Sequence, residues 1–421
     1  MRIISYRLPK NNNKMAQHVI FAAPFFMDAT VRFLRGACQL PNVALTVVSQ
    51  DVAERLPADV LDRIAGHWRV DDALDPQQLV DAARQLQMKF GQASSYLATL
   101  EQLQVPLAMA REVLGIEGLS VAAAGNFRDK ARMKDVLRAA GVPCARHALI
   151  GDREAARTFT GRVGFPVVVK PPDGAGGKAT FRLDQPGDLD TLLHRYPPDA
   201  VHPTLFEEFV RGTEHSFDSV FIKGRPVWHS ISRYMPSPLE VLENDWIQWC
   251  VLLPRDISGA EYVPIREAGF RAIEALGLQT GLSHMEWFQL ADGSIAISEV
   301  GARPPGAQFA SLLSYAHDVD FYSAWPRLMV HAEFDPPVRR YAAGAAYIRG
   351  QGRGRISQLH GVDAVQRRFG SIIVEAKLPD QGQPPSDSYE GDGYIIVRHP
   401  DTDVVQEALQ QIVSTIRVEL R

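Results

Sequence analysis

The stretch His284-Met-Glu-Trp-Phe-Gln-Leu-Ala-Asp-Gly-Ser-Ile-Ala-Ile-Ser-Glu299 carries the strongest structural signal in this chain. Its Asp292-Gly293 pair lies between two apolar runs, which is a strong short-range signal of a β-hairpin and favours a two-residue type I′ turn. Counting outward from that turn places Glu286 directly opposite Glu299, on the same face, with Cβ atoms roughly 5 Å apart. The sequence therefore predicts a hairpin that holds two facing carboxylates.

Two like charges directly opposed on a hairpin destabilise it. A shared proton, a basic neighbour or a divalent cation would relieve the repulsion between Glu286 and Glu299. Magnesium suits this ligand set, because it takes one or two carboxylates and fills its other positions with water and phosphate oxygens. Two solvated, exposed glutamates are the alternative, and the apolar surroundings disfavour it. We interpret the pair as magnesium ligands.

The hairpin is followed by Val300-Gly-Ala-Arg-Pro-Pro-Gly306, a glycine- and proline-rich loop. Arg303 in this loop suits a bidentate clamp on a phosphate or carboxylate group. An ion pair with one of the two glutamates is the alternative. His284 lies opposite Gly301 in the same register and faces the same side, although a single histidine is more often structural than catalytic.

A second glycine-rich segment, Asp173-Gly-Ala-Gly-Gly-Lys-Ala-Thr180, lies between two predicted strands. It does not fit the Walker pattern, since Pro172 stands where the first glycine should be and no Ser or Thr directly follows Lys178. Amides without side chains can still turn inward around a phosphate, with Lys178 adding charge. A mobile hairpin turn explains the same residues. Lys170, at the end of a valine strand, favours the phosphate interpretation unless its side chain simply extends to solvent.

The remaining sequence alternates between strand and helix patterns. Apolar runs at 19–23 and 43–48 and helical spacing over 77–90 predict a parallel α/β domain at the N-terminus. It contains no GxGxxG, so we predict no dinucleotide site there. A helix over 129–140 should end at Gly141.

The predicted fold is a mixture of α/β and α+β units. We expect four parts: an N-terminal α/β domain over 1–125, a small lid-like unit over 126–206, a catalytic α+β unit over 207–335 and a C-terminal α+β subdomain over 336–421. A substrate pocket is one interpretation of three tryptophans and an arginine, but aromatic residues at such spacing are more often core: Trp246, Trp249, Trp287 and Arg233.

Composition limits the classes of partner. With 46% hydrophobic residues, 22% charged residues and a net charge of −4, the chain is typical of a globular protein and has no electrostatic attraction for nucleic acid or an anionic membrane. Its three cysteines are far apart, which favours reduced thiols and a cytoplasmic location. No segment approaches the roughly 18 apolar residues of a membrane span, and residues 1–17 lack the apolar core of a signal peptide. A homodimer is a fair expectation for this size and class.

Between about residues 126 and 306 these motifs resemble the ATP-grasp superfamily, and most of all its L-amino-acid (dipeptide) ligases. Phe127-Arg-Asp-Lys130 is similar to the motif of the family's first lysine, which contacts the ATP phosphates. Phe165-Pro-Val-Val-Val-Lys170 is similar to the second-lysine strand, near adenine and the α-phosphate. The family's flexible loop over the triphosphate corresponds to a segment with four candidate residues, of which the last would also be catalytic: Gly174, Gly176, Gly177 and Lys178.

The resemblance continues into the predicted catalytic unit. Glu207-Glu208-Phe209-Val210 resembles the segment that holds adenine, and Glu214 matches the acid that binds ribose. Glu286 and Glu299 match the magnesium carboxylates, in agreement with the hairpin register. Arg303 matches the catalytic arginine that steadies the transferred phosphate.

One departure concerns the metal. Many members carry an asparagine on a metal at the position of Gly301, so the number of magnesium ions, one or two, is open, and manganese could replace them. The resemblance implies an ATP- and magnesium-dependent ligase that joins a carboxylate to an amine through an acyl phosphate, with amino acids as small-molecule substrates. A biotin-carboxylase-like or purine-pathway ligase, or a non-catalytic nucleotide-binding regulator, is the alternative.

Overall fold

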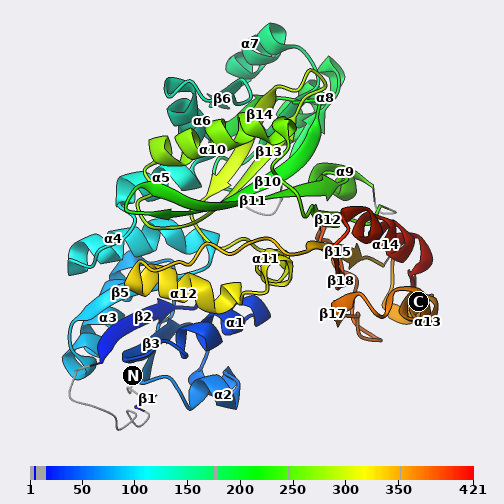
Figure 1. The fold of residues 1–421 in the computed structure, drawn as a ribbon. Coiled ribbons are helices and arrows are strands. Elements are labelled where there is room, and N and C mark those ends of the chain that lie inside the picture. Colours follow the sequence, from blue (N-terminus) through cyan, green and yellow to red (C-terminus); the bar gives the residue numbers. More distant parts are fainter. Residues whose placement is uncertain (1–3, 6–15, 175–178, 245–246, 351) are drawn as a thin grey trace.

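The structure is a computed structural model, which describes residues 4–5, 16–174, 179–244, 247–350 and 352–421. Figure 1 shows an N-terminal domain, a lid-like unit at the opposite end and a long central sheet that continues into the C-terminal part. The mixed α/β and α+β architecture predicted from the sequence is confirmed. Within the described residues, no helix has both the length and the apolar composition to cross a membrane.

The N-terminal domain is built on a five-stranded sheet in the order β1-β4-β3-β2-β5. Strands β2 to β5 pair in parallel, as predicted, and β1 adds an antiparallel edge. The strands are β1 (Ile4–Ser5), β2 (Gln17–Ala22), β3 (Val43–Ser49), β4 (Gly66–Arg69) and β5 (Ala93–Ala98). The helices are α1 (Asp28–Ala37), α2 (Ala58–Leu61), α3 (Pro76–Phe90) and α4 (Gln104–Leu114).

Two later helices, α11 (Phe309–His317) and α12 (Phe321–His331), return to this domain (Figure 1). The ring of Phe33 on α1 lies 4.8 Å from that of Tyr322 on α12. Gly36 permits this close packing, because a Cβ there would stand 2.1 Å from the Tyr322 carbonyl oxygen. The loop that follows the hairpin is thereby tied to the N-terminal domain.

The lid-like unit holds a four-stranded sheet in the order β6-β9-β7-β8. Its elements are β6 (His147–Ile150), α7 (Arg153–Val163), β7 (Val167–Lys170), β8 (Phe181–Leu183), α8 (Pro186–Arg195) and β9 (Thr204–Glu208). Asp152 caps α7 by accepting from the Ala155 N–H, and Gly164 ends the helix with φ 80°. The glycine-rich segment connects the antiparallel strands β7 and β8.

Helices α5 (Val121–Arg128) and α6 (Lys130–Ala139) lead from the N-terminal domain into the lid. Asp129 separates them and caps α6, accepting from the N–H groups of Ala131 and Arg132. The cap begins α6 at Lys130, one residue after the predicted start at 129. Gly141 follows the end of the helix with φ 67°. The sequence therefore places a lysine at the first turn of this helix.

The central sheet has eight antiparallel strands in the order β14-β13-β10-β11-β12-β15-β18-β17. They are β10 (Thr213–Ile222), β11 (Arg225–Met235), β12 (Cys250–Leu253), β13 (Gly281–Gln289), β14 (Ile295–Gly301), β15 (Ala342–Ile348), β17 (Ile373–Lys377) and β18 (Gly393–His399). Its helices are α9 (Pro238–Glu243), α10 (Val263–Leu276), α13 (Val362–Phe369) and α14 (Thr402–Thr415). A separate pair joins β16 (Ile356–His360) to β19 (Arg417–Leu420).

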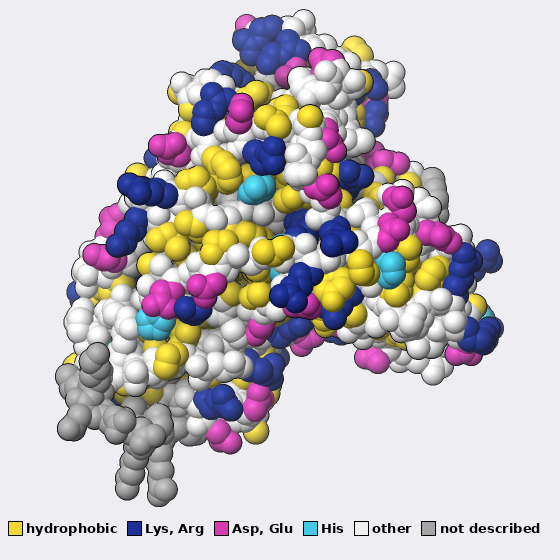
Figure 2. Space-filling view, viewed as in Figure 1, with side chains coloured by type: hydrophobic (Ala, Val, Ile, Leu, Met, Phe, Trp, Pro, Cys, Tyr) yellow, Lys and Arg dark blue, Asp and Glu magenta, His cyan; other side chains and the backbone are white. Residues whose placement is uncertain are grey.

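This sheet crosses the predicted break at residue 335, because β12 pairs with β15. The four-part division of the chain stays a prediction. On the face shown in Figure 2, basic and acidic side chains are interspersed, with no large area of one sign.

Candidate active site

The hairpin formed by β13 and β14 brings the two predicted metal ligands together. Glu286 pairs with Glu299 across the strands, as the sequence predicted. The predicted two-residue turn is wrong, however. The Leu290 N–H donates to the Ser294 carbonyl at 2.9 Å, so the turn has three residues and ends on Gly293 with φ 82°. Three-residue hairpins with a glycine in this left-handed position are common.

A β-bulge restores the register that the longer turn would have shifted. Trp287 pairs with Ile297, whereas Glu286 pairs with Glu299, so Ser298 is the extra residue. The Ser298 carbonyl instead accepts a hydrogen bond from Lys134 Nζ. The two deviations cancel, which is why the carboxylates face each other although the turn differs.

The paired glutamates line a cavity of about 600 Å³ between the lid and the central sheet. The sequence-predicted residues that the structure describes all line it: Lys130, Lys170, Gly174, Glu207, Glu208, Phe209, Val210, Glu214, Glu286, Glu299 and Arg303. The other three predicted residues, Gly176, Gly177 and Lys178, lie outside the described residues. Positions up to 173 residues apart in the chain thus meet in one cavity.

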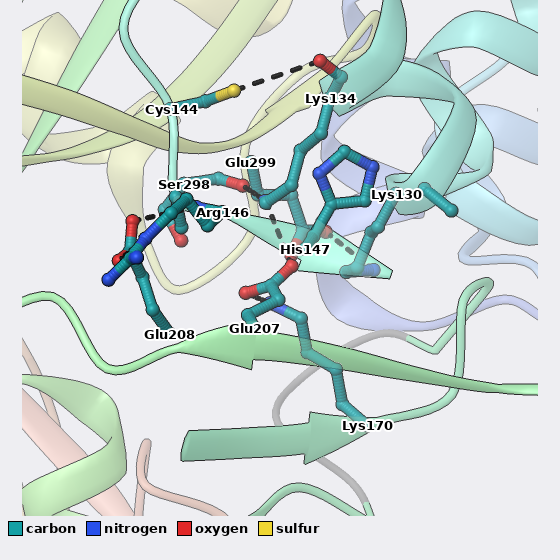
Figure 3. A network of polar contacts seen from close by, with 12 residues as sticks. Lys130, Lys134, Cys144, Arg146, His147, Lys170, Glu207, Glu208, Ser298 and Glu299 are labelled. Carbon is teal, nitrogen blue, oxygen red and sulfur yellow. Dashed lines mark hydrogen bonds and ion pairs between the residues drawn. The ribbon is translucent and has the colours of Figure 1, made fainter. Parts of the chain in front are cut away.

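Glu207 lies between two lysines (Figure 3). Lys134 Nζ and Lys170 Nζ each lie 3.0 Å from one of its carboxylate oxygens. Burial alone would raise the pKa of Glu207, but the two lysines outweigh it and lower the pKa to about 2. Burial lowers the pKa of Lys134, whose side chain is fully enclosed. The sequence reasoning missed Lys134, although it lies one helical turn after Lys130 and so on the same face of α6.

Lys130 contacts both Glu299 and the start of the glycine-rich segment. Its Nζ lies 3.0 Å from Glu299 and donates to the Gly174 carbonyl at 2.6 Å. Burial would raise the pKa of Glu299, but Lys130 and then Lys170 outweigh it, and the pKa lies below its ordinary value. The Lys130 ammonium group therefore places a positive charge beside Glu299 in the cavity.

The pKa of Glu286 is shifted in the opposite direction from that of Glu299. Burial and the charge of Glu299 raise the pKa of Glu286, whose oxygen accepts from the Tyr234 hydroxyl at 3.3 Å. Glu214 is also buried, and burial and Glu286 raise its pKa well above the ordinary value. A cation near these carboxylates would relieve their repulsion.

The donor set fits magnesium. No cluster of three or more acidic, histidine or cysteine side chains suited to a metal occurs among the described residues. The facing carboxylates of Glu286 and Glu299 offer the oxygen ligands that magnesium takes, with water and phosphate oxygens to complete the shell.

Arg303 is held by a residue that the sequence reasoning did not single out. Its Nε–H donates to the Glu101 carboxylate, and its Nη1 donates to the Pro304 carbonyl at 2.8 Å. The predicted alternative, an ion pair with Glu286 or Glu299, does not occur in the described structure. Nothing in the local sequence marks Glu101, which starts a short 3-10 helix after β5.

His284 is fixed by neighbours on several sides. Its Nδ1 lies 2.7 Å from an Asp218 oxygen, and its ring packs edge-on against Phe309 with centroids 4.9 Å apart. Burial would lower the pKa of His284, but Asp218 outweighs it and the pKa is raised. His284 also lines the cavity.

The predicted adenine segment joins the lid to the sheet. Glu208 accepts from the Arg146 backbone N–H at 2.7 Å, which ties β9 to the start of β6. The guanidinium of Arg182 lies 4.4 Å from the centre of the Phe209 ring. Phe209 and Val210, which follow the strand, line the cavity.

An aromatic wall closes the other side of the cavity and was not predicted as a site. Trp249 lies 4.8 Å from the Tyr389 ring and 5.2 Å from the Tyr234 ring. The sequence favoured core positions for the other residues of that set. Trp287 is in the core, and Arg233 donates to the Tyr262 hydroxyl. Trp246 lies outside the described residues.

Comparisons with known proteins relate part of the chain to one family. A family model for the ATP-grasp domain matches residues 135–312. The chain is 22% identical over 320 residues to the L-arginine-specific L-amino acid ligase of Bacillus subtilis, covering 73% of this chain and 76% of the relative. It is 30% identical over 204 residues to the D-alanine–D-alanine ligase of Frankia casuarinae, covering 44% of this chain and 50% of the relative.

A solved structure extends the likeness to nearly the whole chain. The L-amino acid ligase from Bacillus licheniformis superimposes with a TM-score of 0.77 at 18% identity, covering 97% of this chain and 100% of that one. This similarity shows a shared fold.

Proposed function

We propose that this chain, whose residues 135–312 match the ATP-grasp family model, joins the carboxylate of one amino acid to the amine of another. The reaction consumes ATP, requires magnesium and passes through an acyl phosphate. One observation carries the proposal: lysines, an arginine and two facing carboxylates from separate parts of the chain line a single cavity.

In the first step, a carboxylate oxygen of the acid substrate attacks the γ-phosphorus of ATP, and ADP leaves. Glu207 to Val210 hold adenine and Glu214 holds ribose, while Lys170 and Lys130 neutralise phosphate oxygens. Arg303 holds the transferred phosphoryl group in line with the attacking oxygen. Magnesium, held by Glu286 and Glu299, would withdraw charge from the phosphate oxygens when bound.

In the second step, the amine nitrogen attacks the acyl carbon, inorganic phosphate leaves and the nitrogen loses a proton. No protein nucleophile is needed, so catalysis rests on positioning and electrostatics. Lys178 and the glycines at 174, 176 and 177 belong to the segment between β7 and β8 that we assign to the triphosphate. Exclusion of water by that segment would protect the acyl phosphate from hydrolysis.

The test is a matrix of paired amino acids with ATP and magnesium, in which release of ADP and phosphate is measured and products are identified by mass spectrometry. We expect release that needs one acid and one amine and yields the mass of an amide. Glu299→Ala should lose both signals. Glu274→Gln is the matched control, because it removes an exposed carboxylate from α10, outside the cavity.

Other outcomes decide against the proposal. Release that depends on bicarbonate or formate, with no amide of two amino acids, would favour a purine-pathway or biotin-carboxylase-like reaction. Binding of ATP and magnesium without release in any pair would favour a nucleotide-binding regulator.

A further inference from the structure

One segment of the C-terminal part of the chain reaches the cavity, the turn at 386–392 between β17 and β18. This turn is held by its own side chains. Asp392 accepts from the Ser386 N–H at 2.6 Å and from the Gly350 N–H at 2.9 Å, and the Ser388 hydroxyl accepts from the Glu390 N–H at 3.2 Å. Side-chain bonds to the backbone fix such turns. Tyr389 and Glu390 are therefore presented to the cavity by a preorganised segment.

Tyr389 completes the aromatic wall. Its ring meets Trp249 nearly at a right angle, and Trp249 stacks on Tyr347 with centroids 4.8 Å apart. Trp249 is 1% exposed, so this part of the wall is rigid. Aromatic faces attract ammonium and guanidinium groups, more strongly where water is excluded.

Glu390 supplies a carboxylate to this wall, and it differs from its acidic neighbours in having no charged partner among the described residues. Glu101 is paired with Arg303, and Glu299 is paired with Lys130. In the part of the chain that the structure describes, the Glu390 carboxylate has no hydrogen bond or ion pair, although it is half-buried. Burial raises the pKa of Glu390, and the charge of Arg303 only partly offsets this. A half-buried carboxylate without a partner is costly unless a ligand supplies one.

The location of Glu390 indicates which substrate supplies that partner. Tyr389 and Glu390 line the same cavity as Arg303, Glu286 and Glu299, and the charge of Arg303 acts to lower the pKa of Glu390. An acid substrate whose carboxylate lies near Arg303, Glu286 and Glu299 would extend its carbon chain along this wall. The amine substrate needs only to reach the acyl carbon.

We propose that Glu390, backed by Tyr389 and Trp249, binds a positively charged nitrogen group of the acid substrate. This inference rests on the proposed function, in which the acid is a substrate, and adds that the acid carries a positively charged nitrogen group. The cation is either the α-ammonium group or a charged side chain, since an ammonium and a guanidinium group share the chemistry that this wall recognises.

Calorimetric binding of acids to the full chain, with magnesium and a non-hydrolysable ATP analogue present, tests the proposal. Lysine against norleucine isolates a side-chain cation, and norleucine against hexanoate isolates the α-ammonium group. For the wild-type chain we expect at least one charged member to bind about tenfold or more tightly than its neutral partner, the usual range for a charge-assisted contact.

The variant Glu390→Gln should abolish that preference and leave binding of the ATP analogue unchanged. Asp387→Asn is the matched control: it removes an exposed carboxylate from the same turn that does not line the cavity, and it should keep the preference. If Glu390→Gln is folded and retains the wild-type preference in both pairs, or if the wild-type chain has no preference in either, the proposal is wrong. Because binding is measured without turnover, a chain that binds charged acids but forms no amide would refute only the proposed function.

Discussion

Arg303 donates from its Nε to the carboxylate of Glu101, a residue 202 positions earlier in the chain. Glu101 belongs to the N-terminal domain, where it follows β5, and only 9% of it is exposed. The pair therefore makes the N-terminal domain part of the site. The position of Glu101 also favours glycine at position 301, since a Cβ there would stand 3.3 Å from the Glu101 oxygen.

The first prediction follows from this pair. Glu101→Gln keeps the size of the side chain but removes the charge that holds Arg303, so kcat should fall by on the order of 10²-fold, as expected when a phosphate-binding group is misplaced. Affinity for ATP should change little, because adenine and ribose are bound elsewhere. Steady-state kinetics and nucleotide titration check this, with the exposed Glu117→Gln as control. An unchanged kcat would show that Arg303 keeps its position without Glu101.

The second prediction concerns Glu286, which is half-buried opposite a like charge. Glu286→Gln removes that repulsion, so the free energy of unfolding without ligand should rise by up to about 1 kcal/mol. Turnover should be lost and the stabilisation by magnesium and ADP should shrink, because one metal ligand is gone. Urea unfolding with and without magnesium and ADP measures both effects. A variant that is less stable without ligand would mean that the two carboxylates are not in conflict.

The third prediction uses the low pKa of Glu207. Relative to the ordinary value of 4.5, a pKa of about 2 corresponds to roughly 3 kcal/mol of stabilisation. A depressed carboxyl pKa stabilises the fold above the unfolded pKa and loses that effect as the pH falls toward the folded one. Glu207→Gln should therefore be destabilised most at neutral pH, and its difference from the wild type should shrink below about pH 4.5. Urea unfolding at pH 7, 4 and 3 tests this sign, and a difference that grows on acidification would contradict it.

The fourth prediction concerns the coupling between Glu207 and Lys134. Lys134→Met leaves Glu207 with Lys170 alone and removes the donor to the Ser298 carbonyl, at a cost of about 1–3 kcal/mol. In the double variant Lys134→Met with Glu207→Gln, the combined cost should fall short of the sum by about 0.5–3 kcal/mol, as for groups in one network. Additive costs would show that the two side chains act independently.

Much of the site could be predicted because its signals are local. The hairpin and the end of the helix before Gly141 each depend on a few adjacent residues, and the structure contains both. Glu101 and Glu390 could not be found in this way, because only the tertiary fold brings a residue after β5 and a turn before β18 to the same cavity. Lys134 was within reach, since it follows Lys130 by one helical turn.

The hairpin also shows how a correct pairing can rest on an incorrect turn. The prediction assumed two turn residues and no bulge, whereas the structure has three turn residues and an extra residue at Ser298. Both patterns oppose Glu286 and Glu299, so the sequence alone does not distinguish them.

The last prediction tests the bulge itself. Ser298→Ala should change stability by no more than about 0.5 kcal/mol and leave turnover intact, because Lys134 contacts the backbone carbonyl and not the side chain. Deletion of Ser298 removes the extra residue, so Glu299 directly follows Ile297 and still lies opposite Glu286, but Lys134 loses the carbonyl that accepts its hydrogen bond. The deletion should therefore lower the free energy of unfolding by about 1–3 kcal/mol and retain the thermal stabilisation by magnesium and ADP. Urea unfolding and thermal melting measure the two effects, and a loss of that stabilisation would show that the bulge itself positions Glu299.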